Sequence, residues 1–235
     1  MIPLSDDVPG ERLPLVTGAL VLINTLIFLL ESLLGPMTRS LIYTFGVIPL
    51  RLTQQWANPL SWLSLLTSMF LHGGWAHLIG NMLYLWIFGN NVEDRMGHGR
   101  FLGFYLLSGI LASLAQVAAA PQAHIPSIGA SGAIAGVLGA YLLLFPYAHV
   151  RTLVPMPFWI TVISIPAPVV LIGWFIIQFF NGLASLGFSV QTGGVAWWAH
   201  IGGFVAGMVL MPIFRERYRR PSHDWFIEDD WWREV

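Results

Sequence analysis

Charged side chains are absent from long stretches of this chain, and these stretches dominate its pattern. No Asp, Glu, Lys or Arg occurs in four of them: 13–30, 52–92, 101–150 and 152–214. An α-helix needs ~20 apolar residues to cross ~30 Å of hydrocarbon, and breaks containing Pro, Gly or Ser divide the longer stretches. The pattern therefore predicts six membrane-spanning helices, at about 15–35, 75–92, 101–120, 130–147, 160–180 and 196–214.

The composition agrees with a membrane protein. Of the 235 residues, 56% are hydrophobic and 10% are charged, and the mean hydropathy is +0.69, whereas a soluble globular chain is about 25% charged. We expect an all-α membrane protein, with a six-transmembrane-helix bundle at 15–214. A cytoplasmic N-terminal segment at 1–14 would precede the bundle, and a cytoplasmic tail at 215–235 would follow it.

The distribution of arginine predicts the orientation of the bundle, because short cytoplasmic loops carry the excess of basic residues. Six spans place both termini on one side, with nine arginines: Arg12, Arg95, Arg100, Arg151, Arg215, Arg217, Arg219, Arg220 and Arg233. The other side has Arg39 and Arg51. Both termini are therefore predicted to be cytoplasmic. The acidic N-terminal segment has no cleavable signal pattern, so we expect the plasma membrane of a prokaryote.

Two features near the first span have plain interpretations. The long segment 36–74 contains Trp56, Trp62 and Phe70 among apolar residues, which is typical of an interfacial segment anchored by aromatic side chains. Glu31 lies near the end of the first span, and we expect it at the level of the lipid headgroups.

Missing residue types narrow the chemistry. The chain has no Cys and no Lys, which excludes thiolate metal sites, Cys nucleophiles, a Lys Schiff base and a Ser/Lys dyad. There is no HExxH motif for a zinc protease and no Asp inside a predicted span for a paired-aspartate protease. A net charge of −1 argues against a nucleic-acid-binding surface. We expect no metal and no cofactor.

Four polar residues are predicted to lie in one layer of the membrane. His77 and Asn81 are four residues apart at the start of the second span, and therefore share a helix face. Ser131 begins the fourth span, and His200 lies near the start of the sixth. The predicted topology puts all three starts at the non-cytoplasmic side. Polar side chains at such depth usually face the bundle interior or water.

Small residues indicate which spans touch. They recur every four residues in the fourth span (Gly132, Gly136, Ala140) and in the sixth (Ala199, Gly203, Gly207). Such stripes allow two helix backbones to approach closely, and facing stripes would bring Ser131 within reach of His200. Taken singly, each feature has a plain interpretation. A stripe of small residues is typical of ordinary helix packing, Ser131 could be a helical serine bonded to its own backbone, and His200 could be an interfacial histidine. Their conjunction favours a site.

A serine beside a histidine has a clear chemical use. The imidazole accepts the hydroxyl proton while the serine oxygen attacks a carbonyl, and the resulting oxyanion needs preorganised donors. Gly129 and Gly132 would let the backbone approach a substrate closely. No acid in spans two to six could orient the base, so we expect a dyad. The candidate donors are the Asn81 side-chain amide, a His77 ring N–H and the Ser131 backbone N–H.

Three ordered motifs resemble those of the rhomboid family of intramembrane serine proteases, and the resemblance covers about 60–214. They read HGGWAHLIGNMLYLWIFGNNVED (72–94), GASGAIAGVLGAY (129–141) and AHIGGFVAG (199–207). The resemblance implies a six-helix core and cleavage of membrane proteins within or next to their transmembrane segment. It implies that Ser131 is the nucleophile and His200 the general base, with oxyanion positions at His77 and Asn81.

The resemblance also implies supporting roles. His72 matches a motif histidine with a more structural role, and Glu93 and Arg95 match polar residues that tie down the cytoplasmic end. Some family members have an aromatic residue, stacked on the histidine, four positions after the serine. Here that position is Ala135, so another residue must hold the His200 ring, and the sequence does not identify it.

The expected partners are transmembrane protein substrates and the lipid bilayer. A substrate would enter laterally and unwind, past a gate formed by span five and a loop at 181–195 that includes Gly193 and Gly194. Aromatic residues of span five either line that gate or face lipid. Two other functions stay open: a non-catalytic rhomboid-like protein that binds membrane clients, and a channel or transporter lined by His77, Asn81 and His200.

Overall fold

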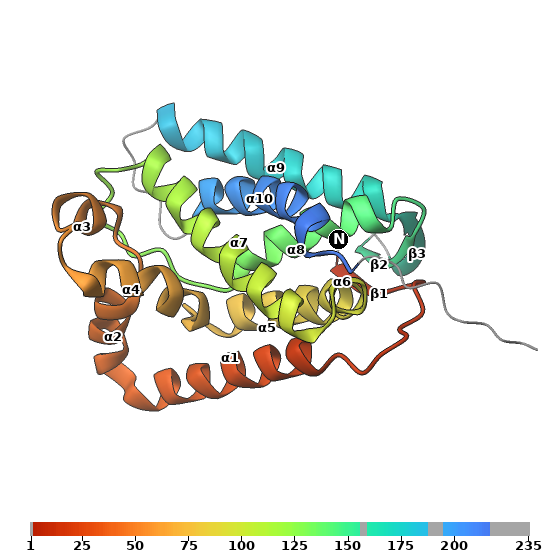
Figure 1. Cartoon of the computed structure of the whole chain (residues 1–235), viewed down its shortest axis with the longest axis horizontal. Coiled ribbons are helices and arrows are strands. Elements are labelled where there is room, and N and C mark those ends of the chain that lie inside the picture. Colours follow the sequence, from red (N-terminus) through yellow and green to blue (C-terminus); the bar gives the residue numbers. More distant parts are fainter. Residues whose placement is uncertain (1, 156–158, 188–194, 217–235) are drawn as a thin grey trace, which may run out of the picture.

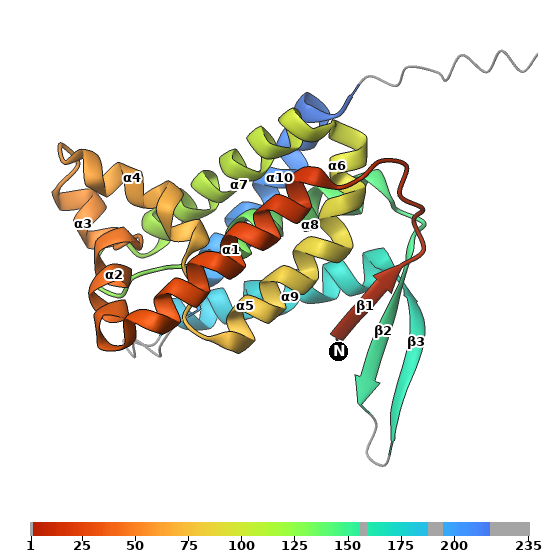
Figure 2. The same ribbon diagram turned by 90° about the horizontal axis from the view of Figure 1, so that it is seen from below.

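Helices lie side by side over most of the chain, and a small sheet projects from one end of the bundle (Figures 1 and 2). The computed structural model describes residues 2–155, 159–187 and 195–216. The longer helices are α1 (Leu15–Leu34), α5 (Trp75–Tyr84), α7 (His98–Ala119), α8 (Ser131–Leu144), α9 (Ala167–Gly187) and α10 (Trp197–Phe214). The shorter ones are α2 (Thr38–Phe45), α3 (Pro49–Gln54), α4 (Pro59–Thr67) and α6 (Asn90–Met96).

Four helical stretches in the described part of the chain are long and apolar enough to cross a membrane: Leu15–Phe45, His98–Ala119, Ala167–Leu186 and Trp197–Phe214. Helix α8 is apolar but shorter, with 14 residues. A π-helical turn at Leu85–Gly89 joins α5 to α6, so helix runs without interruption from 75 to 96. Each predicted span therefore overlaps a helix. The protein is an integral membrane protein with a mostly helical fold.

The all-α prediction was wrong at the sheet, which has the order β1-β2-β3. Strand β1 (Ile2–Asp6) pairs antiparallel with β2 (His149–Pro155), which pairs antiparallel with β3 (Ile160–Pro166). β3 occupies the first seven residues of the predicted span 160–180. A short apolar run fits helix and strand equally by periodicity. Here the β-branched residues of the sequence ITVISI favour the strand.

Helix α9 is displaced along the chain from the predicted fifth span. It begins only after β3 and continues to Gly187, so the predicted loop at 181–195 is helical over its first seven residues. Residues 188–194, with Gly193 and Gly194, lie outside the described residues, as does the tail beyond 216.

Residues 36–74 fold mainly as helices α2, α3 and α4, at the end of the bundle opposite the sheet (Figure 2). The Trp62 indole N–H donates to the carbonyl of Trp56 at 2.7 Å, and both side chains are largely exposed. Exposed indoles suit a membrane interface, and the interfacial placement of this segment stays a prediction.

β1 ties the start of the chain to the bundle through Asp6. One oxygen of its carboxylate accepts hydrogen bonds from the Tyr141 hydroxyl at 2.7 Å and from the Asn91 amide at 2.5 Å. Burial raises the pKa of Asp6 above its ordinary value, and these two hydrogen bonds oppose that shift. The sheet and two helices, α6 and α8, are thereby held together at one end.

The two predicted stripes of small residues face each other across the α8–α10 contact. A Cβ atom at Gly203 would overlap the backbone carbonyl of Gly132, and one at Gly207 would overlap that of Gly136. Helix α10 thus packs backbone to backbone against α8, as small-residue stripes allow. This confirms the predicted contact between the two helices.

At the sheet end, Glu93 of α6 holds the first turn of α1. Its two carboxylate oxygens accept the backbone N–H groups of Val16 and Thr17 at 2.9 and 2.8 Å, and His98 Nδ1 lies 2.5 Å from one oxygen. The first N–H groups of a helix have no intrahelical partner, and a carboxylate there also complements the helix dipole. Glu93 is 1% exposed. Arg95 lies over the Phe145 ring at 5.4 Å.

The α8–α10 contact predicts a position-specific cost for a single methyl group. Gly203→Ala must push the helices apart, and we expect a loss of about 1–3 kcal/mol in unfolding free energy, as for other overpacked cores. Gly173→Ala in α9 is the matched control, because a Cβ there meets nothing within 4 Å. Thermal unfolding in detergent compares the two variants. Equal midpoints would contradict the backbone contact.

The Glu93 cap predicts a second stability difference. Glu93→Ala leaves the partly buried N–H of Val16 and the buried N–H of Thr17 without partners, at about 1–3 kcal/mol each, so we expect a loss of about 2–6 kcal/mol. Asp94→Ala is the control, because Asp94 also accepts two backbone N–H groups, from Glu11 and Arg12, but in exposed hydrogen bonds that water can replace. Denaturation in detergent should separate the variants, and equal losses would argue against capping by Glu93.

Candidate active site

Ser131 is the first residue of α8, and an unusual backbone turn delivers it. Gly129 has φ +117°, a conformation that favours glycine, and its N–H donates to the Ser68 carbonyl at 2.8 Å. A Cβ at Gly129 would come within 2.6 Å of His77 Nε2. Glycine is therefore required here twice, once by the turn and once by the neighbouring imidazole.

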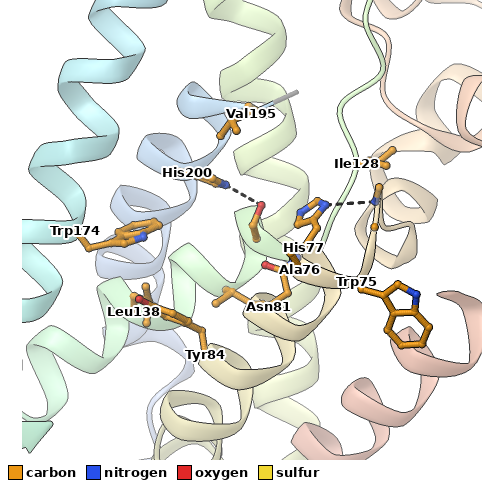
Figure 3. A pocket seen from close by; sticks show the side chains of 16 residues that line it. Trp75, Ala76, His77, Asn81, Tyr84, Ile128, Leu138, Trp174, Val195 and His200 are labelled. Carbon is orange, nitrogen blue, oxygen red and sulfur yellow. Dashed lines mark hydrogen bonds between the residues drawn. The ribbon is translucent and has the colours of Figure 1, made fainter. Parts of the chain in front are cut away.

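The structure brings Ser131 and His200 together. His200 Nε2 lies 2.7 Å from Ser131 Oγ (Figure 3), which is hydrogen-bond distance. Ser131 directly precedes Gly132 in α8, and His200 directly follows Ala199 in α10. The close approach of these helices sets the separation of the two side chains. The hydroxyl and imidazole have the arrangement that a nucleophile and its general base require.

Two residues of α9 contact the His200 ring, one at its Nδ1 atom and one through an aromatic ring. Gln178 Oε1 lies 2.8 Å from His200 Nδ1, and Gln178 is 6% exposed. The Trp174 ring lies 5.7 Å from the imidazole, tilted by 39°. Position 135 is alanine in this chain and has no aromatic ring to stack on the imidazole. Gln178 and Trp174 hold the His200 ring instead.

Sequence reasoning missed Gln178, although a signal was present. It is a lone polar residue between IleIle and PhePhe in the apolar stretch of α9, and polar residues inside spans usually face the protein. The two interpretations of the span-five aromatics, as gate lining or as lipid-facing residues, stay predictions. Trp174 and Phe175 contact α10 residues, while Phe180 is 64% exposed.

His77 and Asn81 project from α5 toward the same space (Figure 3). His77 Nδ1 accepts the Gly73 backbone N–H at 3.4 Å, which leaves the ring proton to Nε2. The Asn81 Nδ2 atom is buried and has no hydrogen-bond partner among the described residues. Ser131 adds a backbone N–H at the start of α8, where helical N–H groups lack intrahelical acceptors. Three donors are thus available near the serine.

A cavity of about 850 Å³ contains these groups. Its lining comes from α5, α8, α9, α10 and the turn before α5, and includes Trp75, Tyr84, Ser131, Trp174 and His200. The volume falls in the range of ligand-binding pockets. A second cavity of about 20 Å³ lies behind Ser131, lined in part by Ser68, Ser113 and Ser127, and has room for a single water.

His72 and Glu31 form a buried polar pair next to the 850 Å³ cavity, behind its lining residue His77. Glu31 is 2% exposed and accepts the His72 backbone N–H at 3.2 Å, so it faces the protein, and its depth at the lipid headgroups stays a prediction. The His72 ring is 1% exposed and packs edge-on to the His77 ring at 5.2 Å. The two residues lie 41 positions apart, a pairing that composition does not indicate.

The predicted site residues fall into two groups. One group lines the two cavities or packs against the lining residues. The lining residues are Ser131, His200, His77, Asn81, Gly129 and Gly132, and Gly203 and His72 pack against Gly132 and His77. Glu93 and Arg95 lie away from these cavities, on α6 at the sheet end of the bundle (Figure 2). Within the described residues, no group of three or more His, Asp or Glu side chains could hold a metal ion.

Comparison with known proteins gives a consistent result. The model of the Rhomboid domain matches residues 59–217. Rhomboid protease GluP of Bacillus subtilis is 41% identical over 130 residues, which are 55% of this chain and 24% of that protein. Rhomboid protein 1, mitochondrial, of Saccharomyces cerevisiae is 31% identical over 170 residues, 67% of this chain and 45% of that protein.

A third relative, Putative rhomboid protease YdcA of Bacillus subtilis, is 36% identical over 83 residues, 35% of this chain and 41% of that protein. This chain thus spans from a quarter to about half of the length of these relatives. The domain match covers more than half of the chain, including the serine, both histidines of the cavity and the asparagine. The chain belongs to the rhomboid family.

Proposed function

We propose that this protein is an intramembrane serine endopeptidase that cleaves transmembrane proteins within or next to their membrane segment. The observation that carries the proposal is the 2.7 Å contact between Ser131 Oγ and His200 Nε2 inside a large cavity. Membership of a family that includes named proteases supports it. Ser131 is the proposed nucleophile and His200 the proposed general base.

The acylation step follows from the geometry. Ser131 Oγ attacks the carbonyl carbon of the scissile peptide while His200 Nε2 takes the hydroxyl proton. The tetrahedral intermediate then expels the amine, which receives that proton from the imidazolium, and an acyl-enzyme remains on Ser131. A carboxylate partner for the base is not required for this proton transfer. Gln178 occupies the position next to Nδ1 that a carboxylate has in a triad.

The negative charge on the attacked oxygen needs donors that are already in place. The buried Asn81 amide, the His77 Nε2–H and the Ser131 backbone N–H are the proposed oxyanion hole. A donor that lacks a partner in the resting protein loses no hydrogen bond when the oxyanion forms. One such donor is typically worth roughly 2.7–4 kcal/mol of transition-state stabilisation.

Hydrolysis of the acyl-enzyme needs water at membrane depth. The 850 Å³ cavity and the small cavity behind Ser131 are the proposed route and store for it. The attacking water gives its proton to His200 Nε2, and the serine oxygen regains a proton as the acid product leaves. Both steps therefore use the same base.

We propose six membrane crossings with both termini in the cytoplasm. Helix length and apolar composition support α1, α7, α9 and α10 as crossings. The continuous 75–96 helix and the shorter, apolar α8 are the other two proposed crossings, and the arginine distribution supports the orientation. The proposed membrane is the plasma membrane of a prokaryote, supported by similarity to two Bacillus subtilis proteins. Relatives from yeast and Arabidopsis thaliana are named mitochondrial and chloroplastic.

The proposed substrate enters between α5 and α9, which both line the cavity. Helix α9 has large outward-facing side chains, among them Ile177, Phe180 and Leu186. A helical substrate protects its own carbonyl groups, so the cleaved stretch must be extended. Helix-weakening Gly or Pro near the cut would ease this unwinding.

Serine reactivity provides the primary test. Co-expression with a panel of single-span membrane proteins should give new fragments with the wild type and none with Ser131→Ala. A fluorophosphonate probe should label the wild type at Ser131 and should label His200→Ala at least about 100-fold more slowly, because general-base assistance is typically worth 10²–10⁴. Cleavage that survives Ser131→Ala would refute the proposal. Client binding without cleavage or labelling would indicate a non-catalytic protein.

The oxyanion assignment makes a separate prediction. Asn81→Ala should lower kcat by about 10²–10³ with little change in KM, because the lost donor acts on the transition state. Asn24→Ala in α1 is the control, since the Asn24 amide is also buried but donates to the Leu20 carbonyl in its own helix. Fragment yield over time at several substrate concentrations gives both constants. A kcat for Asn81→Ala equal to that of the control would remove Asn81 from the oxyanion hole.

A further inference from the structure

Gln178 makes a side-chain contact with the proposed catalytic base from a helix that carries neither Ser131 nor His200. Its Oε1 lies 2.8 Å from His200 Nδ1, on the opposite side of the ring from Ser131. Gln178 is 6% exposed. A long polar side chain that is buried within an apolar helix must be paired to offset its desolvation, and the imidazole is its partner here.

We propose that Gln178 is a positioning residue that selects the reactive tautomer and orientation of His200. This inference rests on the proposed function of the Ser131/His200 pair and deepens it, because it names the third group in the hydrogen-bonded chain. The chain runs from Gln178 on α9 through His200 on α10 to Ser131 on α8. It has the form of a triad in which a neutral amide replaces the carboxylate.

The chemical argument concerns where the single ring proton lies. A neutral imidazole has one N–H donor and one acceptor nitrogen. An amide oxygen accepts only, so Oε1 at 2.8 Å requires the proton on Nδ1. Nε2 then presents its lone pair to the Ser131 hydroxyl at 2.7 Å. The opposite tautomer would donate to the serine oxygen and could not take its proton.

A neutral partner has a second consequence. A carboxylate would both orient the imidazole and stabilise the imidazolium, whereas an amide orients it with little effect on its charge. In the described structure no Asp, Glu or Arg lines the cavity, and its titratable lining groups are His200 itself, His77 and Tyr84. His72 contacts the His77 ring from behind. A carboxylate introduced at 178 would therefore be the nearest negative charge to His200.

The test uses two substitutions of Gln178 in the full-length protein. Gln178→Met keeps the length of the side chain but removes the acceptor, and we expect kcat to fall about 10- to 100-fold with KM nearly unchanged. Gln178→Glu restores an acceptor, and we expect it to recover most of the activity. We also expect its acid limb in the pH profile of kcat/KM to move upward by about one pH unit or more, because the carboxylate favours the imidazolium.

Gln116→Met is the matched control. Gln116 Oε1 accepts the Ala199 N–H at 3.3 Å, so it also bonds the first turn of α10 but does not touch the imidazole. This variant should keep the wild-type pH profile. If Gln178→Met and Gln178→Glu both retain wild-type kcat and the wild-type acid limb, the positioning role is wrong.

The Gln178→Glu variant distinguishes loss of positioning from general destabilisation of the protein. A structural role alone predicts that both Gln178 variants lose activity in proportion to their unfolding midpoints, with no movement of the acid limb, and that result also overturns the proposal. Failure of the proposed function would look different, because Ser131→Ala would then still cleave and the fluorophosphonate would not label the wild type at Ser131. If cleavage depends on Ser131 but the Gln178 variants keep the wild-type kcat and pH profile, only the positioning role is rejected.

Discussion

Direct backbone contact between α8 and α10 is the constraint on which the rest of the site depends. The carbonyl groups of Gly132 and Gly136 occupy the space where side chains at 203 and 207 would lie. Ser131 and His200 are next to this contact in sequence, so their 2.7 Å separation is set by how closely the helices approach. A membrane offers no hydrophobic drive to press helices together, so close packing of small residues provides the attraction.

Buried polar groups have different surroundings at the two ends of the bundle. At the sheet end, Asp6 and Glu93 each accept two hydrogen bonds from chain segments that are far away in sequence. Near the cavity, Asn81 Nδ2 and both His72 ring nitrogens are buried without partners in the described structure. The two carboxylates thus fasten one end of the bundle, although Thr17 Oγ1 and Asn91 Oδ1 are buried there without partners in the described structure. The unpaired groups of Asn81 and His72 differ in lying at or next to a large cavity, where a bound molecule or water can satisfy them.

Much of this arrangement could be predicted from the sequence because its determinants are local. Charge-free stretches indicated where the helices lie, and four-residue spacings indicated which faces meet. Gln178 was missed because its significance depends on α9 packing beside α10, and Glu31 because its partner His72 is distant in sequence. The sheet was missed because ITVISI reads equally as part of a span. Its assignment to a strand depends on pairing with β2 and, through it, on β1 at the opposite end of the chain.

The length of α8 has a consequence for the depth of the serine. Fourteen residues at 1.5 Å each give a helix of about 21 Å, against a hydrocarbon thickness of about 30 Å. With its last turn at the cytoplasmic boundary, the helix would stop about 9 Å short of the outer one. Under the proposed function, the reachable peptide bonds of a substrate are therefore those within roughly two helical turns of its outer end. Bonds nearer the bilayer centre would stay out of reach whatever their sequence.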